Sequence, residues 1–229
     1  MKNIMLLKKG FTMSIEFYQL ILFALFIRSV PIVKIPFRML STYIHELGHG
    51  FMAILMFGSI KKITLNYDGS GACQYNYKNA FTHFLITLFG YITTSIVGYY
   101  MYYIAKVESS MITVESIYFT LGFIAMSILL WVKDIKTFIL VLSIALIFSI
   151  TVADQFTNLF DISSYTLLYV QFIGTYVMID AFISPLHLID GKDDGDGASL
   201  AQRTGIPEGF WIVLWLSIAS YFLYKAYIL

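Results

Sequence analysis

Long apolar stretches separated by short polar segments run through most of this chain. They lie near residues 14–33, 37–57, 81–105, 114–132, 135–153, 165–187 and 210–228. Because a helix needs about 20 mainly apolar residues to cross a bilayer, each stretch is a candidate transmembrane helix. The fourth and fifth are short and only a few polar residues part them, so they form either two spans or one tight helical hairpin. The pattern predicts an all-α polytopic membrane protein with six to seven transmembrane helices.

One segment, residues 60–77, follows a different pattern. Apolar and polar residues alternate on both sides of the turn-forming run Asp68-Gly69-Ser70-Gly71, which predicts a short β-hairpin directly after the second apolar stretch. The edge of such a hairpin can bind an extended peptide by strand addition. The alternative is a connecting loop whose aromatic side chains rest on lipid headgroups, and the sequence leaves both open.

Composition supports the membrane assignment and excludes other classes. The 229 residues are 59% hydrophobic and only 13% charged, far more apolar than a soluble domain. The net charge of +1 and the lack of a basic cluster argue against nucleic acid as a partner. Cys73 is the only cysteine, which excludes an intramolecular disulfide. No internal repeat is evident, so we expect one membrane-embedded domain over residues 1–229.

Positive charges in the loops predict the orientation, because cytosolic loops are richer in Lys and Arg. With the N-terminus in the cytosol, the cytosolic side holds ten of these residues and the other side five. The ten are Lys2, Lys8, Lys9, Lys61, Lys62, Lys78, Lys133, Lys136, Lys192 and Arg203. The first stretch lacks a small-residue cleavage site, so we expect it to be retained as a span. A small chain without a transit-like N-terminus is expected in a bacterial plasma membrane.

The second apolar stretch contains the run His45-Glu46-Leu47-Gly48-His49. Two histidines four residues apart share one face of a helix, and a glutamate beside them can act as a general base. This is the arrangement that binds zinc and activates a water molecule for hydrolysis. Histidine and glutamate are costly inside a bilayer, which favours metal binding here over a chance occurrence.

A hydrolytic zinc site usually has three protein ligands, so a third must come from elsewhere in the chain. Asp180 lies within an apolar helix, where an aspartate needs a partner or a wet cavity. Several further carboxylates lie in the connection after that helix. The two remaining histidines are also candidates, although they are better explained as residues at the membrane interface than as zinc ligands. The candidates are His83, Asp180, His187, Asp190, Asp193, Asp194 and Asp196.

Several of these motifs together resemble the site-2 protease family of intramembrane zinc metallopeptidases, in its short B-type (M50B-like) branch. The resemblance rests on His45 to Gly50, the hairpin with Asp68 to Gly71, Phe89-Gly90-Tyr91, the run Gly195-Asp196-Gly197-Ala198-Ser199-Leu200-Ala201, Thr204-Gly205-Ile206-Pro207, and Trp211 with Trp215. It extends from about Ser41 to Trp215. Residues 105–165 match no motif of the family.

The resemblance implies an aspartate as third zinc ligand, in an Asp-Gly pair that opens a helix near the end of the core. Asp196-Gly197 fits this description best, Asp190-Gly191 competes with it, and Asp180 comes third. The implied protein is a zinc metalloendopeptidase with one Zn²⁺ per chain, held by His45, His49 and Asp196, and with Glu46 as catalytic base. Its substrate would be a membrane protein or peptide, cleaved in or next to a transmembrane segment.

Two other functions remain open from the sequence. A non-proteolytic membrane protein could keep the zinc-binding helix and hold client helices. A transporter could use Asp180 and the acidic turn as its pathway. Zinc content separates transport from the first two functions, and cleavage lost on chelation separates the protease from the client-binding protein. The sequence indicates neither the substrate nor the oligomeric state.

Overall fold

The structure is a computed structural model that describes residues 16–107, 162–189 and 195–229, together with 122–123, 125–127, 129–139 and 142–143. The described elements are α1 (Phe17–Ser29), α2 (Lys34–Leu55), β1 (Ser59–Leu65), β2 (Gly71–Asn76), α3 (Ala80–Lys106), α6 (Ile162–Ile183), the 3₁₀ helix η2 (Ser184–Leu188), α7 (Gly195–Thr204) and α8 (Glu208–Tyr227). The predicted spans 114–132 and 135–153 lie largely outside the described residues.

Three of the described helices are long and apolar enough to cross a membrane. They are Ala80–Lys106, Leu167–Leu188 and Glu208–Tyr227, and they confirm the predicted apolar stretches 81–105, 165–187 and 210–228. The pair α1 and α2 passes the same test only when taken together, which makes up to four spans in the described part of the chain. A mostly helical architecture with three to four candidate membrane spans and a small two-stranded sheet is therefore confirmed for the described residues, whereas six to seven spans are not.

The first two predicted spans form two helices with a sharp bend between them. Helices α1 and α2 meet at 107°. Val30 ends α1 in an extended conformation, as expected for a residue that precedes a proline, and Pro31 follows it. Helix α1 has 13 residues and is about 20 Å long, shorter than the hydrocarbon core of ~30 Å.

The predicted hairpin is present and lies against α2. Strands β1 and β2 pair antiparallel, with Ile63 opposite Cys73 and Leu65 opposite Gly71. In the turn, the Asp68 carboxylate accepts hydrogen bonds from the Ser70 backbone N–H and hydroxyl. The outer edge of β1 is covered, because Ile63 bridges to Val132 and the Leu65 N–H donates to the Thr137 hydroxyl.

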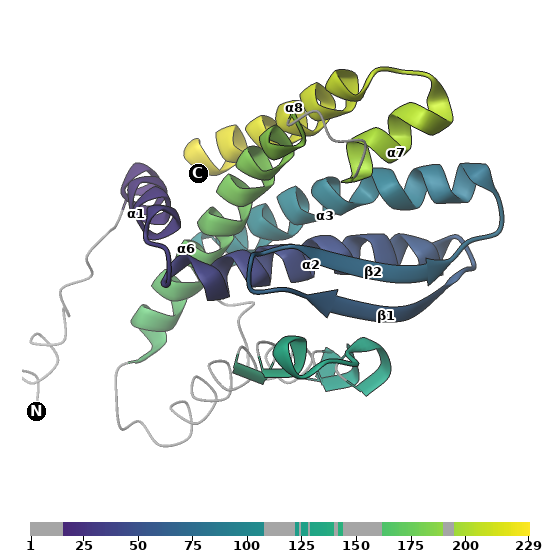
Figure 1. Cartoon of the computed structure of the whole chain (residues 1–229). Coiled ribbons are helices and arrows are strands. Elements are labelled where there is room, and N and C mark those ends of the chain that lie inside the picture. The colour runs from purple at the N-terminus through teal and green to yellow at the C-terminus, as the bar shows by residue number, and fades with distance from the viewer. Residues whose placement is uncertain are drawn as a thin grey trace, which may run out of the picture.

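Helix α3 is the centre of the helical packing and contacts α2, α6 and α8 (Figure 1). Asn79 caps its first turn by accepting a hydrogen bond from the Thr82 N–H. Between α3 and α6, Gly98 and Gly174 face each other and allow a close approach of the two backbones. The C-terminal α7 and α8 also pack against α3, through the buried cluster of Leu200, Trp211 and Trp215.

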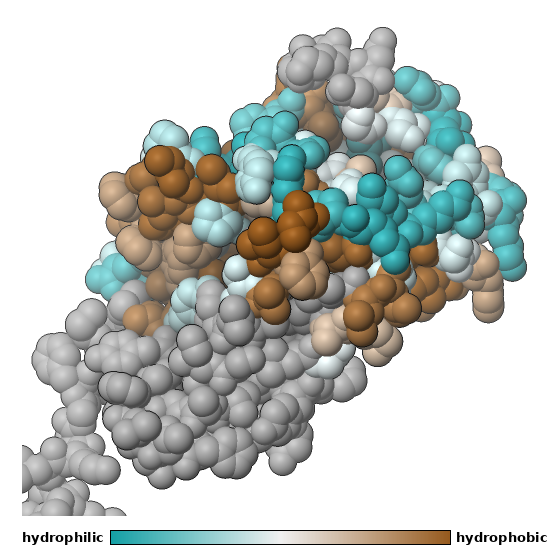
Figure 2. Space-filling view, turned by 60° about the horizontal axis from the view of Figure 1, so that its bottom comes forward, coloured by the Kyte–Doolittle hydropathy of each residue, from teal (hydrophilic) through white to brown (hydrophobic). Residues whose placement is uncertain are grey.

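Apolar and polar side chains are unevenly distributed on the face that Figure 2 shows. Figure 2 shows apolar side chains gathered toward the α1 end and polar side chains toward the hairpin. Leu22 and Phe26 of α1 and Val213 of α8 are among the exposed large apolar residues. Such exposure is expected where lipid, rather than water, surrounds the protein.

Candidate metal centre

Helix α2 presents the two histidines of the His-Glu-x-x-His run on one face. Their rings lie edge to face with centroids 4.6 Å apart, as the helical spacing predicts. His49 is buried and His45 is partly buried. The helix can approach α3 closely here because of Gly48, where a Cβ would come within 2.7 Å of the Thr93 side chain.

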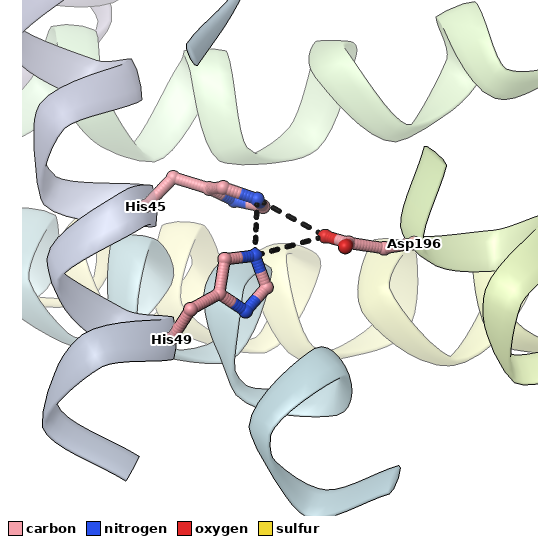
Figure 3. Close-up of side chains that lie close together, drawn as sticks. All are labelled: His45, His49 and Asp196. Atoms are coloured by element: carbon pink, nitrogen blue, oxygen red, sulfur yellow. Dashed lines mark hydrogen bonds and ion pairs between the residues drawn. The ribbon is translucent and has the colours of Figure 1, made fainter. Parts of the chain in front are cut away.

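Helix α7 brings the carboxylate of Asp196 to the two imidazoles (Figure 3). Its Oδ2 lies 3.1 Å from His45 Nε2 and 3.2 Å from His49 Nε2, and the two Nε2 atoms are 3.0 Å apart. The turn into α7 requires Gly195, which has φ +90°, a conformation that favours glycine. Residues 151 positions apart in the chain thus meet at one point.

The geometry of these three groups fits a zinc ion. Their ligand atoms all lie within 4.8 Å of one another. A tetrahedral zinc with bonds of about 2.0 Å separates its ligand atoms by about 3.3 Å, close to the distances found here. His49 Nδ1 donates a hydrogen bond of 2.7 Å to the Ile86 carbonyl, which leaves the Nε2 lone pair directed at the site. Two imidazoles and one carboxylate are typical ligands of hydrolytic zinc.

Asp196 is held in the ionised form that a metal ligand needs. Burial acts to raise its pKa, but when the histidines are protonated, before a metal binds, the charge of His49 and the hydrogen bonds from His45 and His49 act in the opposite direction. Their combined effect is larger, so the pKa of Asp196 lies well below the usual range of an aspartate.

Glu46 lies beside these residues on the wall of a cavity of about 470 Å³. The side chain is buried, and Gly71 of the hairpin leaves room for it, because a Cβ there would come within 2.8 Å of Glu46 Oε1. The candidate metal ligands and the hairpin both contribute to the lining, which includes His45, His49, Gly69, Ser70, Gly71, Ala72, Cys73, Tyr75 and Asp196. The Glu46 carboxylate, the candidate metal ligands and a strand therefore face the same space.

The other candidate ligands are placed differently. Asp180 forms an ion pair with Arg28 of α1 and also lines the cavity, so it has both the partner and the polar surroundings that the sequence called for. His187 lines the cavity outside the three-residue group. His83 lies near Thr87 and against the Tyr77 ring. The predictions on Asp190, Asp193 and Asp194 fall outside the described residues.

Sequence reasoning missed the support that α3 gives to the histidines. Gly90, Thr94 and Gly98 form a small-residue stripe that indicates helix packing, and Gly98 does pack against α6. Gly90 instead faces the imidazoles, and a Cβ there would come within 2.6 Å of Cε1 of both His45 and His49. The available signal is the run Phe89-Gly90-Tyr91, which the family resemblance includes without giving Gly90 a role. In the structure, the centroid of the Tyr91 ring lies 4.4 Å from that of the His45 ring.

Comparison with known proteins identifies the family. The model of the Peptidase M50B-like family matches residues 18–226, nearly the whole chain. No curated protein and no solved structure matches the chain. The matched range includes α2 with its two histidines and α7 with Asp196, and it confirms the resemblance to the B-type branch of the site-2 proteases. The chain belongs to the Peptidase M50B-like family.

Proposed function

We propose that this protein is an intramembrane zinc metalloprotease that hydrolyses peptide bonds in or next to transmembrane segments. One observation carries the proposal: His45, His49 and Asp196 converge with their ligand atoms within 4.8 Å, beside the buried carboxylate of Glu46. The two helices that supply them lie far apart in the sequence. A chance His-Glu-x-x-His run would not be expected to meet a carboxylate from another helix at metal-binding distance.

Each residue of the site has a defined part in the proposed reaction. His45, His49 and Asp196 hold the metal. When bound, zinc polarises the scissile carbonyl and makes a water molecule acidic enough to react near neutral pH. Glu46 takes a proton from that water and later delivers it to the leaving amine. The hydrogen bond from His49 Nδ1 to the Ile86 carbonyl keeps that ring oriented toward the metal.

The hairpin supplies a means of holding the substrate. A helical segment protects its own amides, so it must unwind locally before cleavage. Among the described residues β2 pairs only with β1, and Ala72, Cys73 and Tyr75 of β2 line the cavity. The unwound peptide can therefore add to the free edge of β2 through backbone hydrogen bonds. This favours the substrate-binding role of the hairpin over that of a connecting loop.

The proposed setting is a bacterial plasma membrane, with the N-terminus and the mouth of the cavity on the cytosolic side. Support comes from the loop charges, since Lys61, Lys62, Lys78 and Arg203 belong to the hairpin, its connection to α3, and α7, which lie near the candidate metal centre. Cytosolic water would then reach the cavity without crossing the bilayer.

Replacement of Glu46 by glutamine tests the function directly. Purified Glu46→Gln protein in detergent micelles is expected to keep about one zinc per chain, measured by atomic emission, and to lose cleavage of a transmembrane peptide. A chelator should abolish cleavage by the unmodified protein, and added zinc should restore it. The matched control is Glu16→Gln, the same change at an exposed helix cap, which should leave cleavage intact.

Two results would contradict the proposal. Normal cleavage by the Glu46→Gln variant would exclude Glu46 as the base. Zinc binding combined with tight retention of a transmembrane peptide, but no cleavage by the unmodified protein, would instead support a non-proteolytic membrane protein that holds client helices.

A further inference from the structure

The face of α2 that carries the metal-binding histidines also carries an arginine. Arg38 precedes His45 by seven residues, two helical turns, so the two side chains lie on nearly the same face and about 10 Å apart along the axis. Both line the cavity of about 470 Å³, as do Ser41 and Thr42 between them. The cavity therefore extends from the candidate metal centre to the guanidinium group.

The turn of the hairpin runs alongside this face of α2. The Thr42 hydroxyl donates a 2.8 Å hydrogen bond to the Gly69 carbonyl. A Cβ on Gly69 would come within 2.5 Å of Arg38 Nε, and a Cβ on Gly71 within 2.8 Å of Glu46 Oε1. The turn thus lies level with Arg38, and the start of β2 lies level with Glu46. An extended peptide that follows the edge of β2 past Glu46 would also pass Arg38.

Arg38 differs from the other charged groups of the cavity lining, because it has no ion-pair partner among the described residues. The other charged groups of the lining are Glu46, Asp180 and Asp196. Glu46 and Asp196 belong to the candidate metal centre, and Asp180 is paired with Arg28. Arg38 forms no ion pair within the described part of the chain. Its charge helps to lower the pKa of the exposed Asp68 in the turn, but the two groups are not in ion-pair contact. A cationic group with five N–H donors therefore faces the cavity without a carboxylate bound to it.

We propose that Arg38 binds a carboxylate of the substrate peptide, about three residues from the bond that is cleaved. The spacing follows from the distance of about 10 Å along α2 and the rise of about 3.3 Å per residue in an extended peptide. Guanidinium groups bind carboxylates through paired, charge-assisted hydrogen bonds, which are stronger in partly buried surroundings than in water. The substrate class is thus a peptide with an Asp or Glu side chain, or a free C-terminus, at this distance. The inference rests on the proposed proteolytic function.

Binding of designed peptides tests the inference. The probes are fluorescent peptides with one shared apolar sequence, carrying a single Glu or Gln three residues before or after the central bond, with an amidated C-terminus. A further peptide carries no Glu and ends in a free carboxylate three residues after that bond. Fluorescence polarisation with the protein in detergent micelles should show about tenfold tighter binding of a Glu peptide, or of the free-acid peptide, than of its neutral counterpart. Which of them binds tighter identifies the source of the carboxylate.

Variants of the arginine assign the preference to this residue. Arg38→Gln should remove the preference, Arg38→Lys should keep part of it, and Arg38→Glu should favour a peptide with Lys at the same place. Lys34→Gln is the matched control, because it removes a positive charge one turn earlier in α2, from a residue outside the cavity lining. This control should bind the Glu peptide like the unmodified protein.

Equal binding of all acidic peptides and their neutral counterparts by the unmodified protein would overturn the inference, and this comparison needs no protein variant. So would a preference that persists in folded Arg38→Gln protein. Cleavage is measured separately on the same peptides. Cleavage without a preference for acidic peptides would contradict only the role of Arg38, whereas a preference in binding with no cleavage of any peptide would contradict only the proteolytic function.

Discussion

Gly90 of α3 lies directly against the ring of His49 of α2. A Cβ on Gly90 would come within 2.6 Å of His49 Cε1 and 2.7 Å of His49 Nε2, and within 2.6 Å of His45 Cε1. These distances are shorter than any normal contact of a side-chain carbon. The absence of a side chain at position 90 therefore leaves the space in which both imidazoles turn toward Asp196.

Gly90→Ala is expected to lower zinc affinity strongly. One added methyl group must displace at least one imidazole or push α2 away from α3, and small errors in ligand position cost a metal site much of its affinity. Zinc content after dialysis against a weak chelator measures the effect, and we expect a loss of about tenfold or more in affinity. Gly209→Ala in α8 is the control, because a Cβ there meets nothing within 4 Å. Full zinc retention in folded Gly90→Ala protein would show that the rings do not have to lie as described.

The third metal ligand can be assigned with alanine variants of the three aspartates that the sequence offered. Asp196→Ala should lose zinc, because it removes the carboxylate that lies 3.1 and 3.2 Å from the two Nε2 atoms. Asp190→Ala and Asp180→Ala should keep it. Loss of zinc from Asp190→Ala together with its retention by Asp196→Ala would transfer the ligand role to the other Asp-Gly pair.

Asp180→Ala should instead lower stability, since it leaves the Arg28 guanidinium without its partner in a mostly buried position. Removal of one member of a buried ion pair typically costs about 3 kcal/mol or more. Thermal unfolding in detergent measures the loss, and the double variant Arg28→Met with Asp180→Leu should recover much of it. A double variant as unstable as Asp180→Ala would show that the free charge is not the cause.

Much of the local structure could be predicted from the sequence because its signals are local. The spacing of His45 and His49 fixes their common face on a helix, and the alternation around Asp68-Gly69-Ser70-Gly71 fixes the hairpin. The apolar stretch 81–105 became α3 almost residue for residue. Each of these depends on neighbours within a few residues, so periodicity is sufficient to find them.

The relationships that the sequence could not supply all depend on distant contacts. Arg28 and Asp180 are 152 residues apart, and the sequence around either residue does not indicate that the other is its partner. The role of Gly90 follows from the position of two rings on another helix, whereas its spacing from Gly98 indicates helix packing alone. The bend between α1 and α2 had a local signal in Pro31, but hydropathy alone favoured two separate spans.

The thiol of Cys73 is expected to react slowly. Burial raises its pKa to about 12, and the negative charge of Glu46 adds to the effect. A group with a raised pKa stays protonated below it, so at pH 8 only about one thiol in 10⁴ is the reactive thiolate. Alkylation by iodoacetamide, followed by mass spectrometry, should be roughly a hundredfold or more slower than in the unfolded chain at the same pH.

The same thiol reports on the charge of Glu46. Glu46→Gln removes that charge and should lower the pKa of Cys73, so alkylation at a given pH should be faster than in the unmodified protein. Glu16→Gln should have no effect on the rate. Rapid alkylation of the unmodified, folded protein at pH 8 would show that the thiol is not shielded in the way described.

The close approach of α3 and α6 depends on a pair of glycines. A Cβ on Gly98 would come within 2.8 Å of the Met178 backbone nitrogen, and a Cβ on Gly174 within 2.6 Å of the Gly98 carbonyl oxygen. Backbone atoms cannot rotate away as a flexible side chain can. Gly98→Ala and Gly174→Ala should therefore each force the helices apart and lower the free energy of unfolding by about 1–3 kcal/mol.

The double variant distinguishes this cause from a general effect of substitution. Once one methyl group has separated the helices, the second meets less resistance, so Gly98→Ala with Gly174→Ala should cost less than the sum of the single variants. Unfolding in detergent at several denaturant concentrations measures all three, with Gly209→Ala as the unhindered control. Strict additivity, or single variants as stable as the unmodified protein, would contradict a shared contact between the two backbones.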